Sequence, residues 1–416
     1  MDYKKKSLRS NLITYALVVA FYVFCEALLR TGNMSSLTKG LLVPFCYYAI
    51  VAVALNLVVG TSGELSLGHA GFMCVGAFSS AIFAVTAGAN MPTYLELALA
   101  VLIGAVSAGI AGFLIGIPVL RLKGDYLAIV TLAFGEIIKN VINAVYLGID
   151  SNGVHFSLKD AKSMGLADDG TTIIKGAQGI GGLPRNASFT VGIILVLITL
   201  FIVLNLINSR HGRAIMAIRD NRIAAEATGL SVSHYKMLAF TVSAAIAGVA
   251  GVLYSHNLAN LQATSKSFGY NQSIMILVFV VLGGIGSVRG SLIAAVLLTL
   301  LPEKLRFLSN YRMLIYAVVL IAIMIFNSSP KVVEWRKMVV ARLNRSKRID
   351  EAVKAVDAQE KAEEAGANET SAQDAASSQS TETQDKTAVQ SAVQSENAET
   401  ESMKSGDPDH TKEAQR

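Results

Sequence analysis

The chain has 416 residues, of which 52% are hydrophobic and 16% are charged, and its mean hydropathy is +0.49. An average soluble domain carries about a quarter charged residues, so much of this chain must face something other than water. The net charge of +6 comes from short lysine and arginine clusters between apolar runs. Such clusters exclude a nucleic-acid-binding protein with one basic face and instead indicate membrane topology. We therefore predict an all-α membrane protein, a polytopic helical bundle.

The first predicted crossing follows a basic cytoplasmic N-terminus at residues 1–10. Its charged residues precede an apolar run at 11–30. A signal peptide has a shorter apolar centre and a small-residue cleavage site, which this run does not offer. The run is therefore interpreted as a transmembrane helix that starts in the cytoplasm.

The further crossings follow from the apolar runs, because about 20 apolar residues span the roughly 30 Å of hydrocarbon in a bilayer. These runs predict a permease domain at 11–330 with about 8–10 transmembrane helices. The runs lie near 11–30, 41–60, 94–118, 125–147, 189–208, 236–256, 272–302 and 312–328.

Two stretches depart from a continuous apolar helix. Gly60–Val85 begins with GTSGELSLGHAGF, and Val280–Leu298 has a glycine-rich break between two apolar pieces. Backbone that is not helical is tolerated in a membrane only inside protein or beside a water-filled cavity. One broken or re-entrant segment in each half of the chain is typical of transporters built from two related halves. We expect such halves here, although no strong sequence repeat links them.

The positive-inside rule orients the bundle, because basic connections stay in the cytoplasm. It predicts that both termini are cytoplasmic and that the number of crossings is even. The remaining segments are an extracytoplasmic loop at 148–188, a cytoplasmic loop at 209–235, a basic juxtamembrane segment at 331–348 and a polar tail at 349–416. The tail has almost no aromatic or branched apolar residues, so we expect it to be disordered.

The chain offers few residues for chemistry of its own. Cys25, Cys46 and Cys74 lie inside apolar runs without paired spacing, and we expect small buried hydrophobes. The six histidines are too scattered to predict a metal site. The sequence contains no Gly-Lys pair and hence no phosphate-binding loop of the GxxxxGK[ST] type. We predict no enzyme activity and no bound cofactor, so energy for transport must come from elsewhere.

The cytoplasmic loop at 209–235 is too polar for lipid. Ile215, Ile218, Ile223 and Ala227 have helical spacing, and Gly229 is a typical helix stop. We predict one short helix on the cytoplasmic surface, with a mixed-charge face that suits a protein groove. The alternative is an ordinary amphipathic connector.

This loop resembles the coupling loop of ABC importer permeases, whose loose pattern is Glu-Ala-Ala, three residues, then Gly. Ile223 stands where the pattern has glutamate, while the two alanines and the glycine match. The resemblance at Ala224, Ala225 and Gly229 implies a contact with ATPase subunits, to which the mixed-charge face would add Arg219, Asp220 and Glu226.

Five segments in order resemble the LivM-type permeases of branched-chain amino acid ABC importers, over residues 40–328. They are Ala54–Phe78, Leu122–Val141, Gly179–Pro184, His211–Phe240 and Val280–Glu303. The chain departs from this family at Lys175–Ala177, on the predicted outer face.

This resemblance implies a chain in the cytoplasmic (inner) membrane that carries branched-chain amino acids and pairs with a sister permease subunit as a heterodimer. It also implies two ATP-binding subunits that use the ATP, and an extracytoplasmic substrate-binding protein.

The predicted translocation path contains the two broken segments and one further helix. Polar groups at membrane depth are costly unless they are used. The candidate residues are Gly63, Glu64, Ser66, Gly68, His69, Thr131, Glu136, Gly283, Gly284 and Ser287.

Structural roles compete with these functional interpretations. Ser62, Glu64 and Ser66 have an alternative role as helix caps, and His69 and the glycines have an alternative role in helix packing. We further expect Glu136 to face the bundle interior, paired with Lys139.

Three other functions stay open at this point. Related permeases for urea or short amides share the same segments. An ion-coupled secondary transporter would use Glu64, His69 and Glu136 as a relay. A membrane scaffold would recruit partners through the tail.

Overall fold

The computed structural model describes residues 2–305 apart from 33, 89, 90, 123, 151, 152 and 167–169, with isolated positions between 311 and 325. The chain divides into two units, 1–329 and 330–416, and only the first contains described residues. The predicted segments at 331–348 and 349–416 lie outside the described residues, as does most of the predicted crossing at 312–328.

Seven helices in the described part are long and apolar enough to cross a membrane, so the predicted polytopic helical bundle is confirmed. The crossing that contains α3 begins with the short helix α2 (Ser36–Gly40). The seven are α1 (Asp2–Arg30), α3 (Leu42–Asn56), α4 (His69–Thr86), α5 (Thr93–Val119), α6 (Asp125–Ala144), α7 (Phe189–Asn208) and α10 (Val232–Ser255). Two shorter helices follow, α11 (Tyr270–Gly283) and α12 (Val288–Lys304).

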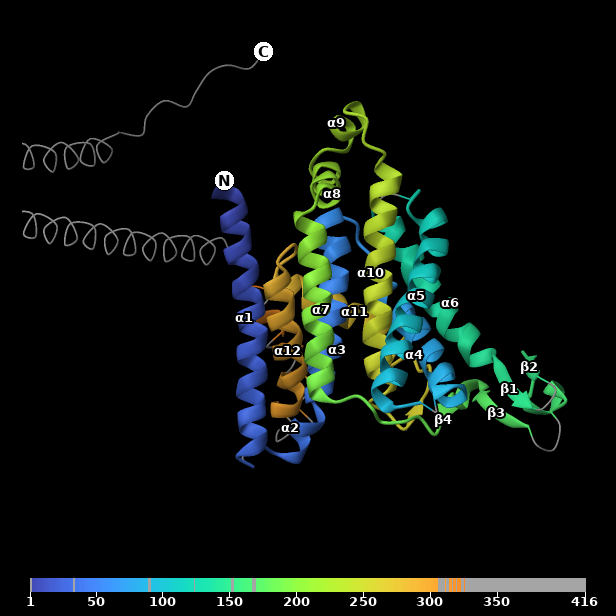
Figure 1. Cartoon of the computed structure of the whole chain (residues 1–416). Coiled ribbons are helices and arrows are strands. Elements are labelled where there is room, and N and C mark those ends of the chain that lie inside the picture. Colours follow the sequence, from blue (N-terminus) through green and yellow to red (C-terminus); the bar gives the residue numbers. More distant parts are fainter. Residues whose placement is uncertain are drawn as a thin grey trace, which may run out of the picture. The chain divides into compact units, whose positions relative to one another are not determined.

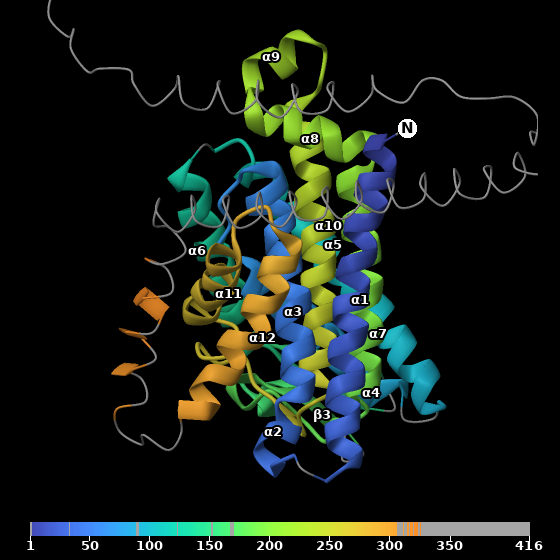
Figure 2. The ribbon, with the colours of Figure 1, turned by 90° about the vertical axis from the view of Figure 1, so that its left-hand side faces the viewer.

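The bundle has two distinct ends. Helices α8 (Arg210–Asp220) and α9 (Arg222–Ala227) project beyond one end, which also holds the start of α1 and the start of α10 (Figures 1 and 2). We call this the α9 end. The strands lie at the opposite end, which we call the sheet end (Figure 1). The connection between α5 and α6, which contains Arg121, also lies at the α9 end (Figure 1), so these two basic connections share one end of the bundle.

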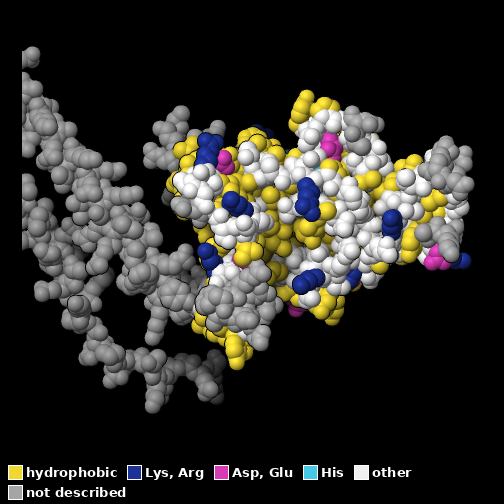
Figure 3. Space-filling view, turned by 90° about the horizontal axis from the view of Figure 1, so that it is seen from below, with side chains coloured by type: hydrophobic (Ala, Val, Ile, Leu, Met, Phe, Trp, Pro, Cys, Tyr) yellow, Lys and Arg dark blue, Asp and Glu magenta, His cyan; other side chains and the backbone are white. Residues whose placement is uncertain are grey.

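The sheet end carries regular structure that the sequence analysis did not predict. The connection after α6 forms a three-stranded antiparallel sheet of β1 (Tyr146–Asp150), β2 (Gly153–Ser157) and β3 (Thr171–Lys175), in the order β2-β1-β3. A second pair joins β4 (Ile180–Gly181) to β5 (Asn260–Leu261). Seen from this end, lysine and arginine side chains are scattered among apolar and uncharged ones (Figure 3).

Helix α3 forms the centre of the bundle, and 94% of the residues in an 18-residue apolar stretch of the crossing Ser36–Ser62 are buried. Around it, α4, α5 and α10 pack through small residues. A Cβ atom on Gly76 would lie 2.4 Å from Cα of Gly248, and one on Gly248 would lie 2.4 Å from the carbonyl oxygen of Gly104. Small residues allow such close approach between helices in a membrane.

Both predicted broken segments are present. Helix α3 continues as a π-helical turn at Leu57–Ser62 and ends at Gly63, whose φ is +73°, and α4 begins only at His69. The second break separates α11 from α12 at 284–287 and uses positive φ at Gly284 and Gly286. The α11–α12 turn points toward the α9 end (Figure 2). Gly283 and Gly290 meet there so closely that a Cβ atom on Gly290 would lie 1.7 Å from the carbonyl oxygen of Gly283.

Candidate functional site

The first break, residues 57–68, lies between several elements, and we call it the broken segment. On one side it touches the α11–α12 turn. The backbone N–H of Gly286 donates to Asn56 Oδ1 at 2.8 Å, and a Cβ atom on Gly60 would lie 2.5 Å from the nitrogen of Gly286. The two irregular pieces of backbone therefore meet at Gly60, which is buried, while residues 285–287 of the turn are exposed.

Arg219 connects α8 to the broken segment. Its Nη1 atom donates to the carbonyl oxygen of Gly60 at 2.7 Å, while its Nε and Nη2 atoms donate to Asp220 Oδ1 at 3.0 and 2.9 Å. The stem of Arg219 packs over Gly63, where an added Cβ atom would lie 2.6 Å from Cγ of the arginine. Glycine is thus favoured at position 63 by space as well as by its positive φ.

Glu64 makes a second charged contact with the region that follows α9. Its carboxylate pairs with the ammonium group of Lys236 in the first turns of α10, and both side chains are largely buried. The predicted capping role of Glu64 is wrong. Helix α4 begins after Gly68 without a side-chain cap, and the Glu64 carboxylate pairs with Lys236 instead.

His69 joins three elements through a chain of hydrogen bonds. The Ser243 hydroxyl donates to the carbonyl oxygen of Ala54 at 2.5 Å, so His69 Nε2 must be the donor in its 2.7 Å contact with Ser243 Oγ. The other ring nitrogen, Nδ1, then accepts from Ser66 Oγ at 3.3 Å. His69 is fully enclosed and holds α4 against α10 and α3, which is a packing role.

Thr131 fixes the far end of the broken segment to α6. Its hydroxyl accepts from the backbone N–H of Leu67 at 3.0 Å and donates to the carbonyl oxygen of Ala128 at 2.9 Å. A Cβ atom on Gly68 would lie 2.6 Å from the carbonyl oxygen of Thr131. Any side chain at position 68 would therefore push the broken segment away from α6.

Glu136 belongs to a different cluster from the broken segment. It pairs with Lys139 at 2.5 Å, as predicted, and accepts from the first backbone N–H of α11, on Tyr270, at 2.6 Å. Lys139 also donates to Ser265 Oγ at 2.9 Å. A carboxylate at a helix N-terminus complements the helix dipole, so this cluster attaches α6 to α11.

The other predicted path residues shape the α11–α12 turn. Gly283 permits the close approach to Gly290, and Gly284 supplies a positive φ of +92°. Ser287 caps α12 by accepting from the backbone N–H of Gly290 at 3.2 Å. Their described roles are turn formation and close packing beside the broken segment.

The segment at 209–235 forms two helices, so the prediction of one helix is wrong. Asn221 is extended and caps α9 by accepting from the backbone N–H of Ala224 at 3.0 Å. Asparagine is a favoured N-cap, which explains the break. Ile215 and Ile218 are buried as expected, but Ile223 is 80% exposed.

Helix α9 ends at Gly229, as predicted. This residue has φ +83°, its N–H donates to the carbonyl oxygen of Glu226, and the N–H of Leu230 donates to that of Ala225. These two bonds form a Schellman motif. Ala225 packs with Ile218 and the start of α10, while Glu226 pairs with Arg222 at 2.9 Å on the exposed side.

Sequence reasoning missed partner residues of this site, among them Asn56, Lys236 and Ser243. Asn56 carried the clearest signal, because an amide in the middle of an apolar run is costly in a membrane unless it is bonded. Lys236 gave no local signal of its role, since its partner Glu64 lies 172 residues away. The three cysteines are free and buried, as predicted.

The fold and the site define a polytopic helical membrane protein whose broken membrane segments contact a helical surface loop, the architecture of a permease. The sequence model of the family described as "Branched-chain amino acid transport system / permease component" matches residues 37–325, and the chain belongs to this family.

The chain is 38% and 36% identical to the high-affinity branched-chain amino acid transport system permease protein LivM of Salmonella typhimurium and of Escherichia coli. Each comparison covers 67% of this chain and 66% of the relative, so the matched region spans just under two thirds of either LivM protein. The fructose import permease protein FruG of Bifidobacterium longum is 26% identical over 70% of this chain and 83% of its own length. No solved structure matches the chain.

Proposed function

We propose that this chain is the permease subunit of an ABC importer for branched-chain amino acids in the bacterial inner membrane. Family membership and the two LivM relatives support this substrate class. The proposed complex contains a sister permease subunit, two ATP-binding subunits that hydrolyse ATP, and an extracytoplasmic binding protein. In this arrangement the α9 end and both termini face the cytoplasm.

The observation that carries the proposal is the double attachment of the α8–α10 region to the broken segment. Arg219 lies before α9 and bonds the carbonyl oxygen of Gly60, while Lys236 lies after α9 and pairs with Glu64. A displacement of α9 by an ATP-binding subunit would therefore act on the broken segment from two points. The broken segment in turn contacts the α11–α12 turn where Gly60 packs against Gly286, beside the hydrogen bond from Gly286 to Asn56 at the end of α3.

This linkage supports alternating access, in which a path beside residues 63–72 and 283–290 opens to one side of the membrane at a time. Glu64 and His69 each have partners within the protein. A path whose polar groups are already paired suits an aliphatic zwitterion, because no free charge would trap it.

Reconstituted uptake tests the proposal. The complete complex in proteoliposomes should accumulate leucine when ATP is supplied to the ATP-binding subunits, and excess isoleucine or valine should compete. Accumulation of urea without leucine would overturn the substrate class. Leucine uptake driven by an ion gradient in the absence of the ATP-binding subunits would instead identify a secondary transporter.

The Arg219 contact predicts a specific coupling defect. Arg219→Ala removes a charged hydrogen bond to a backbone carbonyl, an interaction worth about 1.5–3 kcal/mol. This free energy corresponds to about a tenfold or larger change in the equilibrium constant between two conformations. We expect a fall of this order in leucine transported per ATP hydrolysed, with membrane insertion unchanged.

Arg30→Ala is the matched control, since Arg30 makes an exposed ion pair with its near neighbour Glu26 at 3.3 Å. It should behave like the wild type. An Arg219→Ala complex with wild-type transport per ATP would contradict the linkage.

A further inference from the structure

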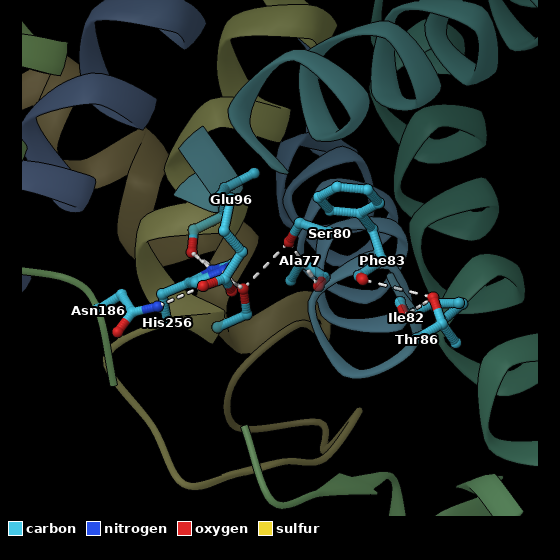
Figure 4. A network of polar contacts seen from close by, with 10 residues as sticks. Ala77, Ser80, Ile82, Phe83, Thr86, Glu96, Asn186 and His256 are labelled. Carbon is cyan, nitrogen blue, oxygen red and sulfur yellow. Dashed lines mark hydrogen bonds and ion pairs between the residues drawn. The ribbon is translucent and has the colours of Figure 1, made fainter. Parts of the chain in front are cut away.

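A second polar cluster lies at the sheet end, away from the broken segment. It joins Glu96 in the first turn of α5, Asn186 before α7 and His256 directly after α10 (Figure 4). Asn186 Nδ2 donates to Glu96 Oε2 at 2.6 Å, and Glu96 Oε1 lies 3.8 Å from His256 Nε2. Glu96 Oε1 and His256 Nε2 are both buried, and neither atom has a hydrogen-bond partner in the described part of the chain.

The contacts of the other ring nitrogen, Nδ1, show which nitrogen of His256 carries the hydrogen. His256 Nδ1 lies 3.0 Å from the carbonyl oxygen of Val252 and 3.1 Å from Ser255 Oγ. A carbonyl oxygen only accepts, and the Ser255 hydroxyl already donates to that same carbonyl at 2.9 Å. Nδ1 therefore carries the hydrogen, and Nε2 of the neutral ring is an acceptor.

A carboxylate at Glu96 would place a second acceptor opposite His256 Nε2. Two buried acceptors without a hydrogen between them are unfavourable, because each has lost its water. One proton on Glu96 Oε1 would serve both atoms and leave Oε2 free to accept from Asn186, once a small side-chain rotation shortens their 3.8 Å separation to hydrogen-bond distance. Burial lowers the pKa of His256, so the ring is neutral near physiological pH and does not supply the proton itself.

The neighbouring groups that the structure describes supply no other hydrogen to Glu96 Oε1 or His256 Nε2. Ser80 of α4 approaches Ser255 at 3.1 Å and donates to the carbonyl oxygen of Ala77, and both serines are uncharged. The stem of Glu96 lies beside Gly88. Arg185, next to Asn186 in the chain, is exposed at the surface.

We infer that Glu96 holds one proton and donates it to Nε2 of His256 when their 3.8 Å separation closes, and that Glu96, bonded in this way to His256 and also to Asn186, latches two segments of the sheet end. The segments are 179–188 and 256–261. Their backbones are joined beside the cluster by Leu183 N–H to the oxygen of Ala259 at 3.1 Å, by Ala187 N–H to that of His256 at 3.3 Å, and by the β4–β5 pair. The latch is a device of the fold, and it does not depend on the proposed transport function.

The latch predicts a pH dependence with a defined sign. The folded chain holds a proton at Glu96 that an unfolded carboxyl releases above about pH 4. Folded-state stability from this group is therefore complete at low pH and decreases as pH rises. Glu96→Gln mimics the latched state at every pH, because its amide oxygen can accept from Asn186 and its NH2 group can donate to His256.

Thermal unfolding of the purified full-length chain in detergent, between about pH 5 and about pH 8, tests this inference. We expect the unfolding equilibrium constant of the wild type to rise relative to that of Glu96→Gln, by up to tenfold per pH unit. Glu26→Gln, at an exposed ion pair, should keep the wild-type dependence. Parallel curves for wild type and Glu96→Gln would overturn the latch.

A second measurement, infrared spectroscopy, uses the wild-type chain and so does not depend on whether a variant folds. A protonated buried carboxyl group has an infrared carbonyl stretch that shifts in D2O and disappears when the group is titrated. The wild-type chain should show this band at neutral pH and lose it in alkaline buffer. Its absence at neutral pH would show that Glu96 is ionised, and the inference would then be wrong.

Discussion

At the scale of single residues, Glu64 and Lys236 place opposite charges in a nearly closed environment, with side chains 13% and 14% exposed. Loss of one partner leaves the other charge buried, which costs about 3–5 kcal/mol in a fully buried pair and less where some water remains. We expect Glu64→Gln and Lys236→Gln each to lower both thermal stability and ATP-driven uptake. Glu64→Lys combined with Lys236→Glu should recover part of each loss.

Melting temperature and uptake of the three variants and the wild type are measured together, so the charge swap is compared directly with the two single losses of charge. The exposed pair of Arg222 and Glu226 is the control for stability. Arg222→Gln should change the free energy of unfolding by less than about 1 kcal/mol. If the swapped pair is no better than the worse single variant, the charge interaction is not what attaches α10 to the broken segment.

Sequence reasoning found several important residues but not their partners. Glu64, His69 and Thr131 stood out because polar groups within apolar runs are costly. Their partners Lys236, Ser243 and Leu67 are 172, 174 and 64 residues away in the chain. Local spacing contains no information about such contacts, and the capping role of Glu64 was the best local interpretation. Glu136 and Lys139 were paired correctly because three residues separate neighbours on one helical face.

At the scale of elements, the end of α9 depends on one backbone conformation. Gly229→Ala places a side chain at φ +83°, which costs about 1–2 kcal/mol, and Gly229→Pro also removes the N–H that donates to Glu226. We expect both variants to insert normally and to transport less leucine per ATP, with proline the more damaging. ATPase activity and uptake in proteoliposomes measure this.

Gly40→Ala is the control for a glycine without such a constraint. Gly40 ends α2, and a Cβ atom there would meet nothing within 4 Å. This variant should match the wild type. Wild-type coupling in Gly229→Pro would show that the Schellman turn does not orient α9.

Apolar runs predicted the long helices well, because hydrocarbon thickness fixes the length that a crossing needs. The run at 189–208 coincides with α7, and the breaks fall where glycine and polar residues interrupt the runs. Short elements were predicted poorly. Hydropathy classed 148–188 as a polar connection, although TTIIK in β3 is rich in β-branched residues that favour strands.

At the scale of the whole molecule, the class of protein followed from the order of five segments, and the family comparison confirmed it. The number of crossings did not follow as directly. Seven helices qualify by length and composition, while α11 and α12 are short because glycines divide what had been one predicted run. The meeting of the two breaks at Asn56 and Gly286 required the three-dimensional fold, since 230 residues separate them.

The C-terminal region allows a last prediction, which separates a permease from a scaffold. Residues 349–416 contain almost no aromatic or branched apolar side chains, so their composition predicts that they are not needed for a packed apolar core. A chain that ends after Arg348 should therefore keep leucine uptake within about twofold of the full-length chain, because changes outside packed regions usually cost less than about 0.5 kcal/mol.

A chain that ends after Pro330 is the matched comparison, since it also lacks the basic segment at 331–348. Positive charges next to a crossing hold that side in the cytoplasm. We expect less correctly oriented protein in the membrane and a proportional fall in uptake. If the chain ending after Arg348 inserts normally but loses uptake, the tail is required for function, and a recruiting scaffold becomes the better description of this protein.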